Sequence, residues 1–218
     1  SYTEITVKVG VKQSTALPEK PEKEEKKKTK LGVRSSMANV LIPRYIYEFT
    51  KINKELEIDY VIGYSKQLLQ MVRNGEVDFI LDEYKYDDLT CLELKDTEEC
   101  CFFASINNDI DHIDENNINK YTIHMTKTNK FNEVLLKKVP NIKVEDEVKT
   151  PLMIVKIENG NDIGFTVKSL IEEEVLFGKL KIVKNNFNLP KIPIYAISRK
   201  DYRLDKNEFA MFMTGNLK

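Results

Sequence analysis

The chain has 218 residues, of which 41% are hydrophobic and 32% are charged, and this composition excludes a disordered protein while allowing one large domain or two small lobes. Lys and Arg number 34 against 35 for Asp and Glu, so the formal net charge is −1. A chain without excess positive charge is not expected to bind nucleic acid itself, because such binding depends on neutralising phosphates.

The first thirty residues combine a strand pattern with a charged segment. Residues 4–11 alternate between apolar and polar side chains, as in a half-buried strand. Residues 19–28 contain no apolar side chain and mix Glu with Lys, which is typical of a solvated linker. We therefore assign residues 1–30 to a strand-like segment followed by a charged linker.

From Leu31 onward, short apolar strands alternate with amphipathic helices. In the first half we predict strands at residues 31–34, 57–63 and 77–81, and helices at residues 38–53 and 65–74. Ser65 is expected to cap the second helix and Asn74–Gly75 to end it. Alternation at this spacing predicts parallel strands joined by right-handed crossovers.

The second half repeats the alternation in shorter units. The predicted strands lie at residues 99–105, 121–125, 142–145, 162–167, 180–183 and 192–198. The predicted helices lie at residues 130–138, 151–159, 169–177 and 205–214. Thr150 is expected to cap the helix that starts with Pro151. With this many units, two small α/β lobes fit better than one large sheet.

Several local sequences occur in an order that one known family shares. Residues 31–43 read Leu-Gly-Val-Arg-Ser-Ser-Met-Ala-Asn-Val-Leu-Ile-Pro, and residues 74–80 read Asn-Gly-Glu-Val-Asp-Phe-Ile. Residues 62–69, 155–165 and 174–180 supply three further strings. Together they resemble the effector-binding domain of LysR-type transcriptional regulators over about residues 31–217. The sequence departs from the family pattern in a longer turn at residues 159–162, where Asp162 replaces a glycine.

The resemblance implies an α/β protein with the type 2 periplasmic-binding-protein fold, in which two Rossmann-like lobes are joined by two crossover strands. Lobe I would comprise residues 31–104 and 194–218, and lobe II residues 105–193. The crossovers would be residues 99–105 and 194–199. A small-molecule effector would bind in the interlobe cleft and control DNA binding by a separate winged helix-turn-helix domain that is absent from this chain.

The family also implies homodimers or tetramers formed through the effector domains. The helix at residues 40–49 would then pack on the second lobe of a neighbouring subunit. Exposure of Tyr45 or Tyr47 would support this arrangement, and the alternative is that both are core residues.

Independently of the family, loops at the carboxyl ends of parallel strands lie beside helix N-termini, whose free N–H groups suit the carboxylate or phosphate of a metabolite. We predict a site for a small anionic or zwitterionic ligand there, with Lys127 adding a positive charge. Its predicted residues are Ser35, Ser36, Met37, Tyr64, Ser65, Thr126, Lys127, Thr128, Thr150 and Phe165. The alternatives are helix capping for the hydroxyl residues and core packing for Met37, Tyr64 and Phe165.

No catalytic residue, metal ion or cofactor is predicted. His112 and His124 are twelve residues apart, and the chain lacks the close His and Cys spacings of zinc sites. Two alternatives to a regulator remain: a solute-binding protein of a transporter, and an enzyme such as a deaminase or dehydratase. The enzyme would need a general acid or base, for which Lys127, Asp82 and Glu83 are the candidates.

The three cysteines favour a reducing compartment. Cys100 and Cys101 are adjacent, which is poor geometry for a disulfide, and with Cys91 they cannot all pair. We expect buried inert thiols, with oxidant sensing as the alternative. No apolar run reaches the roughly 18 residues that span a bilayer, and no export signal is visible. The predicted location is therefore cytoplasmic, without membrane partners.

Overall fold

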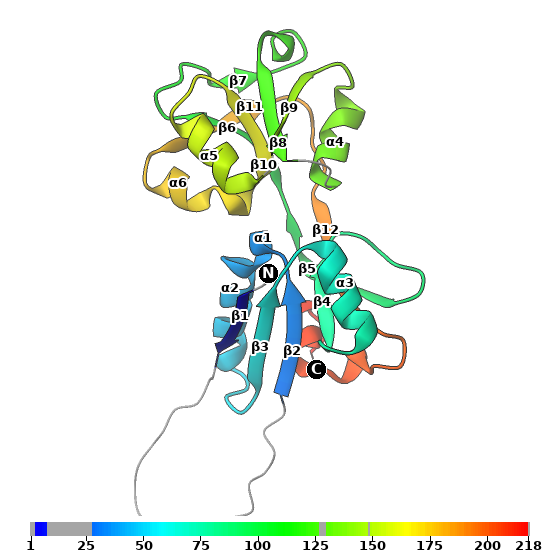
Figure 1. Cartoon of the computed structure of the whole chain (residues 1–218). Helices are drawn as coiled ribbons and strands as arrows, with labels where there is room; N and C mark the ends of the chain where they lie inside the picture. Colours follow the sequence, from blue (N-terminus) through cyan, green and yellow to red (C-terminus); the bar gives the residue numbers. More distant parts are fainter. Residues whose placement is uncertain (1–2, 8–27, 127–129, 148, 218) are drawn as a thin grey trace, which may run out of the picture. The chain divides into compact units, whose positions relative to one another are not determined.

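The structure is a computed structural model that describes residues 3–7, 28–126, 130–147 and 149–217. The chain divides into two compact units, which are described separately. Unit 1 consists of Ser1–Asp96 and Ile194–Lys218, and unit 2 of Thr97–Pro193. Each unit contains a six-stranded sheet with helices packed on it (Figure 1).

The sheet of unit 1 is built around three parallel strands. Its strands are, in spatial order, β1 (Thr3–Val7), β3 (Glu57–Ile62), β2 (Lys28–Val33), β4 (Phe79–Asp82), β12 (Ile192–Ser198) and β5 (Thr90–Glu98). β2 pairs in parallel with β3 and β4, which confirms the predicted pairing. β1 is antiparallel to β3, and β12 is antiparallel to β4.

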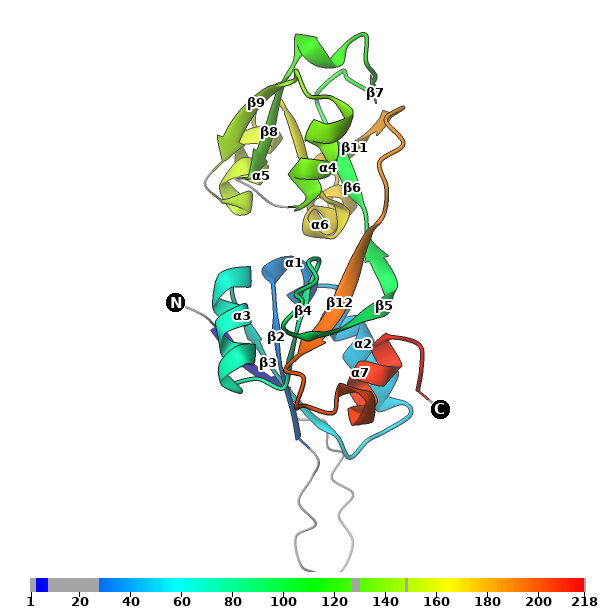
Figure 2. The ribbon, with the colours of Figure 1, turned by 90° about the vertical axis from the view of Figure 1, so that its right-hand side faces the viewer.

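Helices cover both faces of this sheet (Figure 2). They are α1 (Ser35–Ala38), α2 (Leu41–Thr50), α3 (Ser65–Asn74) and α7 (Glu208–Met213), with a 3-10 turn at Leu204–Lys206. α2 and α7 share one core with Leu31 and Phe79, whereas α3 packs with Val61 and Ile80 on the opposite face. Burial on both faces explains why β4 reads as an apolar run from Phe79 to Leu81.

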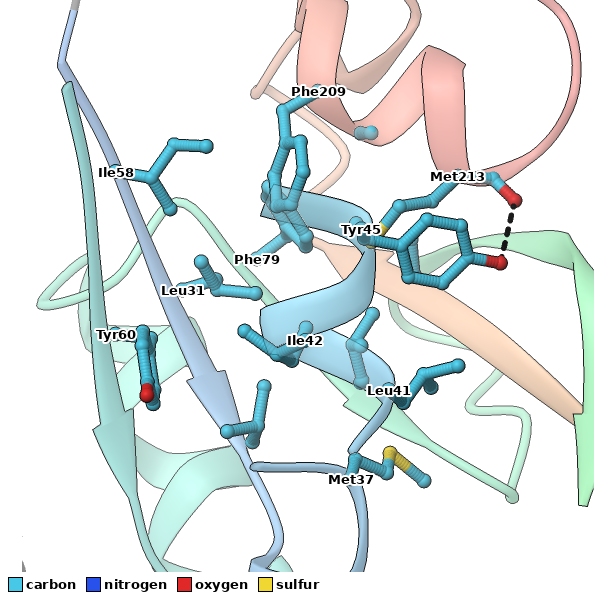
Figure 3. Packing of buried hydrophobic residues seen from close by; sticks show 14 of the residues in the cluster. Leu31, Met37, Leu41, Ile42, Tyr45, Ile58, Tyr60, Phe79, Phe209 and Met213 are labelled. Carbon is cyan, nitrogen blue, oxygen red and sulfur yellow. Dashed lines mark hydrogen bonds between the residues drawn. The ribbon is translucent and has the colours of Figure 1, made fainter. Parts of the chain in front are cut away.

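The α2 face of the core is filled by residues at helical spacing (Figure 3). Ile42, Tyr45, Ile46 and Phe49 are all buried along α2. The Phe49 ring lies 5.4 Å from the ring of Phe209 on α7, and Tyr45 Oη donates to the Met213 carbonyl at 3.4 Å. These contacts fix α7, from the end of the chain, to the first long helix.

Local sequence sets the ends of the unit 1 helices. The predicted helix over residues 38–53 is two helices, because Val40 leaves the helical region with φ −123° and ψ −54°. Starting α2 at Leu41 keeps Pro43 in the first turn, where its missing N–H costs no hydrogen bond. α3 ends as predicted, with Gly75 in the left-handed region at φ 74°.

The sheet of unit 2 mixes parallel and antiparallel pairs. Its strands are, in spatial order, β7 (His112–Ile113), β11 (Leu180–Asn185), β6 (Cys100–Ser105), β10 (Ile163–Val167), β8 (Thr122–Thr126) and β9 (Lys143–Glu147). β10, β8 and β9 are parallel, whereas β6 is antiparallel to both β10 and β11.

The helices of unit 2 also lie on two faces (Figure 1). They are α4 (Lys130–Lys138), α5 (Thr150–Glu158) and α6 (Glu172–Leu176), with 3-10 turns at Ile118–Lys120 and Lys168–Leu170. Phe131 of α4 belongs to the core that contains Phe102 and Phe165. On the other face, Met153 of α5 packs in the cluster of Phe103.

The chain passes between the units in β5 and β12, and this differs from the sequence-based boundaries. The first division falls between Asp96 and Thr97 rather than after Ala104, because β6 lies inside the second sheet. The sequence does not predict β5, and among its nine residues only Leu94 and Glu98 are buried, at 4% and 5% exposure. β1 and the first residues of β2 belong to the first sheet, although residues 1–30 were assigned outside both lobes. Among the described residues, no helix has the length and apolar character needed to cross a bilayer.

Candidate functional site

In unit 1 the strand order reverses at β2, and this is where α/β proteins bind ligands. From β2 the chain passes through α1 and α2 to β3 on one side, and then through α3 to β4 on the other. Loops at the carboxyl ends of strands diverge at such a reversal and leave room for a ligand. Arg34 and Ser35 directly follow β2, and Glu83 directly follows β4.

Three predicted site residues occupy α1. Ser35 is exposed, whereas Ser36 and Met37 are buried, at 5% and 0% exposure. The N-cap position belongs to Arg34, which makes no side-chain capping bond. Met37 is therefore a core residue, as the alternative reading allowed, and Ser35 is the accessible hydroxyl of this turn.

Tyr64 and Ser65 stand at the start of α3, beside the end of β2. The Gly63 N–H donates to the Val33 carbonyl at 3.1 Å, which holds the two strand ends together. Tyr64 occupies the N-cap position and is 70% exposed, so the core reading of Tyr64 is wrong. Ser65 is the first helical residue, and α3 has no side-chain capping bond. The capping role expected of Ser65 is therefore wrong, because the helix starts at Ser65 itself.

Sequence reasoning missed a buried ion pair at the same strand ends. Arg34 Nη1 lies 2.7 Å from Glu83 Oε2, and the Glu83 side chain has no exposed surface. Burial raises the pKa of the Glu83 carboxyl to about 7, against the opposing charge of Arg34, and Asp82 adds to the rise. The Arg34 side chain is 23% exposed, so it is not sealed from solvent as the Glu83 side chain is. Both residues directly follow strands, so the strand-end argument that selected Ser35 would also have selected Arg34 and Glu83.

Asp82 completes this polar cluster. It is 1% exposed and accepts hydrogen bonds from the Glu83 N–H at 2.7 Å and from Tyr86 Oη at 3.1 Å. Burial, followed by the charge of Asp82, raises the pKa of the Tyr86 hydroxyl. Asp82 and Glu83 were the carboxylates of the enzyme reading. Their burial leaves Arg34 and Ser35 as the groups that a solute can reach.

In unit 2 the predicted residues are spread over three elements. Thr126 ends β8 and is half-buried, and its carbonyl accepts a hydrogen bond from Asn132 of α4. Thr150 is the first residue of α5, whose N-cap is Lys149 without a side-chain capping bond. The expected capping role of Thr150 is therefore wrong, because the helix begins one residue earlier than predicted.

The remaining predicted residues of unit 2 differ in how much the structure says of them. Phe165 is 1% exposed, and its ring packs 5.0 Å from the ring of Phe102 in the core, which agrees with the core alternative. Lys127 and Thr128 lie outside the described residues.

A second polar cluster of unit 2 surrounds His124 on β8. His124 Nδ1 lies 2.8 Å from Glu147 Oε1, and Lys156 Nζ lies 2.8 Å from the same oxygen. Burial opposes ionisation of Glu147, but hydrogen bonds from Lys156 and His124 lower its pKa below the usual value. Within the described residues, His124, Glu145 and Glu147 form a group whose ligand atoms lie within 4.8 Å of one another.

Two hollows in unit 1 lie elsewhere. One of about 310 Å³ is lined by Lys28, Thr29 and Leu56, at the amino ends of β2 and β3. The other, of about 570 Å³, adjoins the end of α2. Neither wall contains a predicted site residue, so neither hollow supports the predicted site.

Comparison with solved structures identifies proteins that share this fold. Neither a scan of protein-family models nor a search of curated proteins finds a match. Among solved structures, the effector-binding domain of QuiR in complex with shikimate aligns with a TM-score of 0.71 and 18% identity, over 86% of this chain and 97% of that one. The chain has the fold of LysR-type effector-binding domains.

Two further structures agree with this LysR-type fold. The reduced form of the regulatory domain of OxyR2 from Vibrio vulnificus aligns at TM-score 0.74 and 15% identity, over 91% of this chain and 100% of that one. A putative LysR family transcriptional regulator from Pseudomonas aeruginosa aligns at 0.72 and 14%, over 87% of this chain and 70% of that one. The type 2 periplasmic-binding-protein fold expected from the sequence is confirmed.

Proposed function

We propose that the chain is the effector-binding domain of a LysR-type transcriptional regulator and senses a small anionic or zwitterionic metabolite. The observation that carries the proposal is the fold match, which spans most of this chain and nearly all of the QuiR and OxyR2 domains. The polar residues at the carboxyl ends of β2, β3 and β4 support a ligand-binding role, since strand ends at a reversal bind ligands in this class of sheet.

In the proposed site, Arg34 anchors the anionic group of the effector. Its side chain is partly exposed. Its guanidinium carries a permanent charge and offers several donors in one plane. The exposed hydroxyl of Ser35 and the start of α3 at Tyr64 and Ser65 add donors beside it. Five further residues of the predicted set remain proposed contacts: Ser36, Thr126, Lys127, Thr128 and Thr150.

The effector acts by preferring one arrangement of the two units. Only a difference in affinity between arrangements can shift their populations, whatever the absolute affinity is. Partner chains convert the shift into a change of DNA binding by a separate winged helix-turn-helix domain. The domain works as a homodimer or tetramer in the cytoplasm, and it performs no catalysis. Tyr47 on α2 is 65% exposed, which supports a role for this helix in subunit contacts.

A thermal-shift screen of the whole chain tests the proposal. The panel contains shikimate, amino acids, other carboxylates and sugar phosphates. A binder present at 100 times its dissociation constant stabilises the folded state by about 2.7 kcal/mol. No response from the panel would count against a sensor, and chemical turnover of any binder would favour the enzyme reading.

Two variants locate the binding site. Arg34→Met is expected to lose the response to the effector, and Ser35→Ala to weaken it without lowering the melting temperature of the free protein. Arg73→Met is the matched control, because Arg73 lies in the last turn of α3 and pairs with Asp88 on the surface. An effector response that survives Arg34→Met unchanged would remove Arg34 from the site.

A further inference from the structure

The side chains around His124 share one face of the second sheet. His124 of β8 is in register with Glu145 of β9, and Glu147 lies two residues further along the same strand. Side chains two apart in a strand point to the same face. The face is covered by α5, which contacts both strands (Figure 1). Lys156 belongs to α5. His124 and Glu147 are 4% and 2% exposed.

Both ring nitrogens of His124 face carboxylates. Nδ1 is 2.8 Å from Glu147 Oε1, and Nε2 is 3.2 Å from Asp162 Oδ2. Nε2 is buried and makes no hydrogen bond to any described residue. A neutral imidazole has one N–H and one lone pair, so one of its nitrogens then presents a lone pair to a carboxylate oxygen. Such a contact is repulsive unless a positive group lies between the two atoms.

The charges of the cluster show the same shortage. Glu145, Glu147 and Asp162 bring three carboxylates, and Lys156 brings one ammonium, so the carboxylates outnumber the ammonium by two. A divalent cation would balance this excess. One imidazole and two carboxylates form a donor set that suits Zn²⁺ and similar first-row metals.

We propose that unit 2 binds one divalent transition-metal ion through His124 Nδ1 and the carboxylates of Glu145 and Glu147. One ligand atom from each of the three residues lies within 4.8 Å of the others, and Nδ1 is the ring nitrogen 2.8 Å from Glu147, so small side-chain movements bring the ligands to one ion. Metal on Nδ1 leaves the ring proton on Nε2, facing Asp162. Histidine ligands commonly place their second N–H against a carboxylate in this way, which orients the ring.

Lys156 competes for the same place. Its Nζ lies 2.8 Å and 3.0 Å from the two oxygens of Glu147 and 3.6 Å from Glu145 Oε1. The Lys156 side chain is 43% exposed, so it can withdraw into solvent when a metal binds. Removal of Lys156 should therefore tighten metal binding.

Calorimetric titration of the chelator-treated whole chain with Zn²⁺ tests the proposal. We expect one ion per chain, at least tenfold weaker binding for Glu145→Gln, and tighter binding for Lys156→Ala. Glu145 is half-exposed, so its replacement should not disturb folding. His124→Gln should abolish this binding. His112→Gln is the matched control, because it removes the other histidine of the chain and should leave the affinity unchanged.

Three results would overturn the proposal. Absence of a stoichiometric binding event in the folded wild-type chain overturns the proposal. So does binding that Glu145→Gln and His124→Gln leave unaltered, since the ion would then be held by thiolates or other surface groups. Weakened binding after Lys156→Ala also contradicts it, because the ammonium would then support the site instead of competing. None of these results depends on the effector, so the proposed sensing role stands or falls separately.

Discussion

Replacing Glu83 by Gln is expected to change how the stability of unit 1 depends on pH. The pKa of the Glu83 carboxyl rises from 4.5 to about 7 on folding, chiefly because burial disfavours the charge. The folded state therefore binds the Glu83 proton more tightly than the unfolded state does. Stability from this group is fully present below pH 4.5, and it is lost as the pH rises through 7.

The size of the effect follows from the shift. A difference of one in pKa corresponds to about 1.4 kcal/mol, so the rise of the Glu83 pKa from 4.5 to about 7 gives about 3 kcal/mol between pH 4.5 and pH 8. Glu83→Gln cannot ionise and should lose this part of the pH dependence. The variant also leaves Arg34 without its Glu83 partner; the attraction of Arg34 for the ionised carboxylate already contributes to the Glu83 pKa, so it adds no separate pH dependence.

Urea unfolding at several pH values, followed by circular dichroism because the chain has no Trp, measures the difference. The stability difference between the wild-type chain and Glu83→Gln should change by about 3 kcal/mol from pH 4.5 to pH 8. Glu93→Gln, on the exposed face of β5, is the control and should follow the wild-type curve. Parallel curves for the wild type and Glu83→Gln would refute the reasoning.

Three further changes have defined consequences. Gly164→Ala places a methyl group about 2.1 Å from Phe103 Cζ, and overpacking should cost about 1–3 kcal/mol in the unfolding free energy of unit 2; a melting temperature equal to the wild type would contradict this. Tyr45→Phe removes the buried hydroxyl that bonds Asp96, and calorimetry should show a loss of about 1 kcal/mol, whereas unchanged stability would mean that the bond contributes nothing net. Burial raises the pKa of the Cys101 thiol to about 12, so Cys101 should resist a thiol reagent at pH 8 in the folded chain; rapid labelling of Cys101, mapped by mass spectrometry, would show otherwise.

Elements with a strong local signal were predicted well. The helix from Ser65 to Asn74 has apolar residues at helical spacing and a glycine stop, and both act within one segment. By contrast, β5 contains Glu93 and Lys95 beside its buried Leu94, so its apolar pattern is weak. The break between α1 and α2 depends on keeping Pro43 in a first turn, which the spacing of the apolar residues does not show.

The polar clusters were missed because their members are distant in the chain. Arg34 and Glu83 are 49 residues apart, and His124 and Glu147 are 23 residues apart. No short motif contains such a pair, so it appears only when the register of neighbouring parallel strands is known. The strand-end argument that selected Ser35 would also have selected Arg34 and Glu83. For His124 no comparable signal exists in the sequence, since the residue lies in the middle of β8.

The Arg34–Glu83 pair links the proposed effector site to protons. An effector anion that engages Arg34 competes with Glu83, and an ionised Glu83 left without that charge would be costly in its buried position. Because burial has already raised the Glu83 pKa to about 7, the carboxyl can take up a proton instead. Asp82 favours this uptake, since its charge and hydrogen bond also raise the Glu83 pKa. Effector binding at pH 8 should therefore take up a fraction of a proton, and Glu83→Gln should abolish the uptake. Calorimetric titration in two buffers of different ionisation enthalpy measures it, and equal binding enthalpies in both buffers for the wild-type chain would show that the effector does not draw Arg34 away from Glu83.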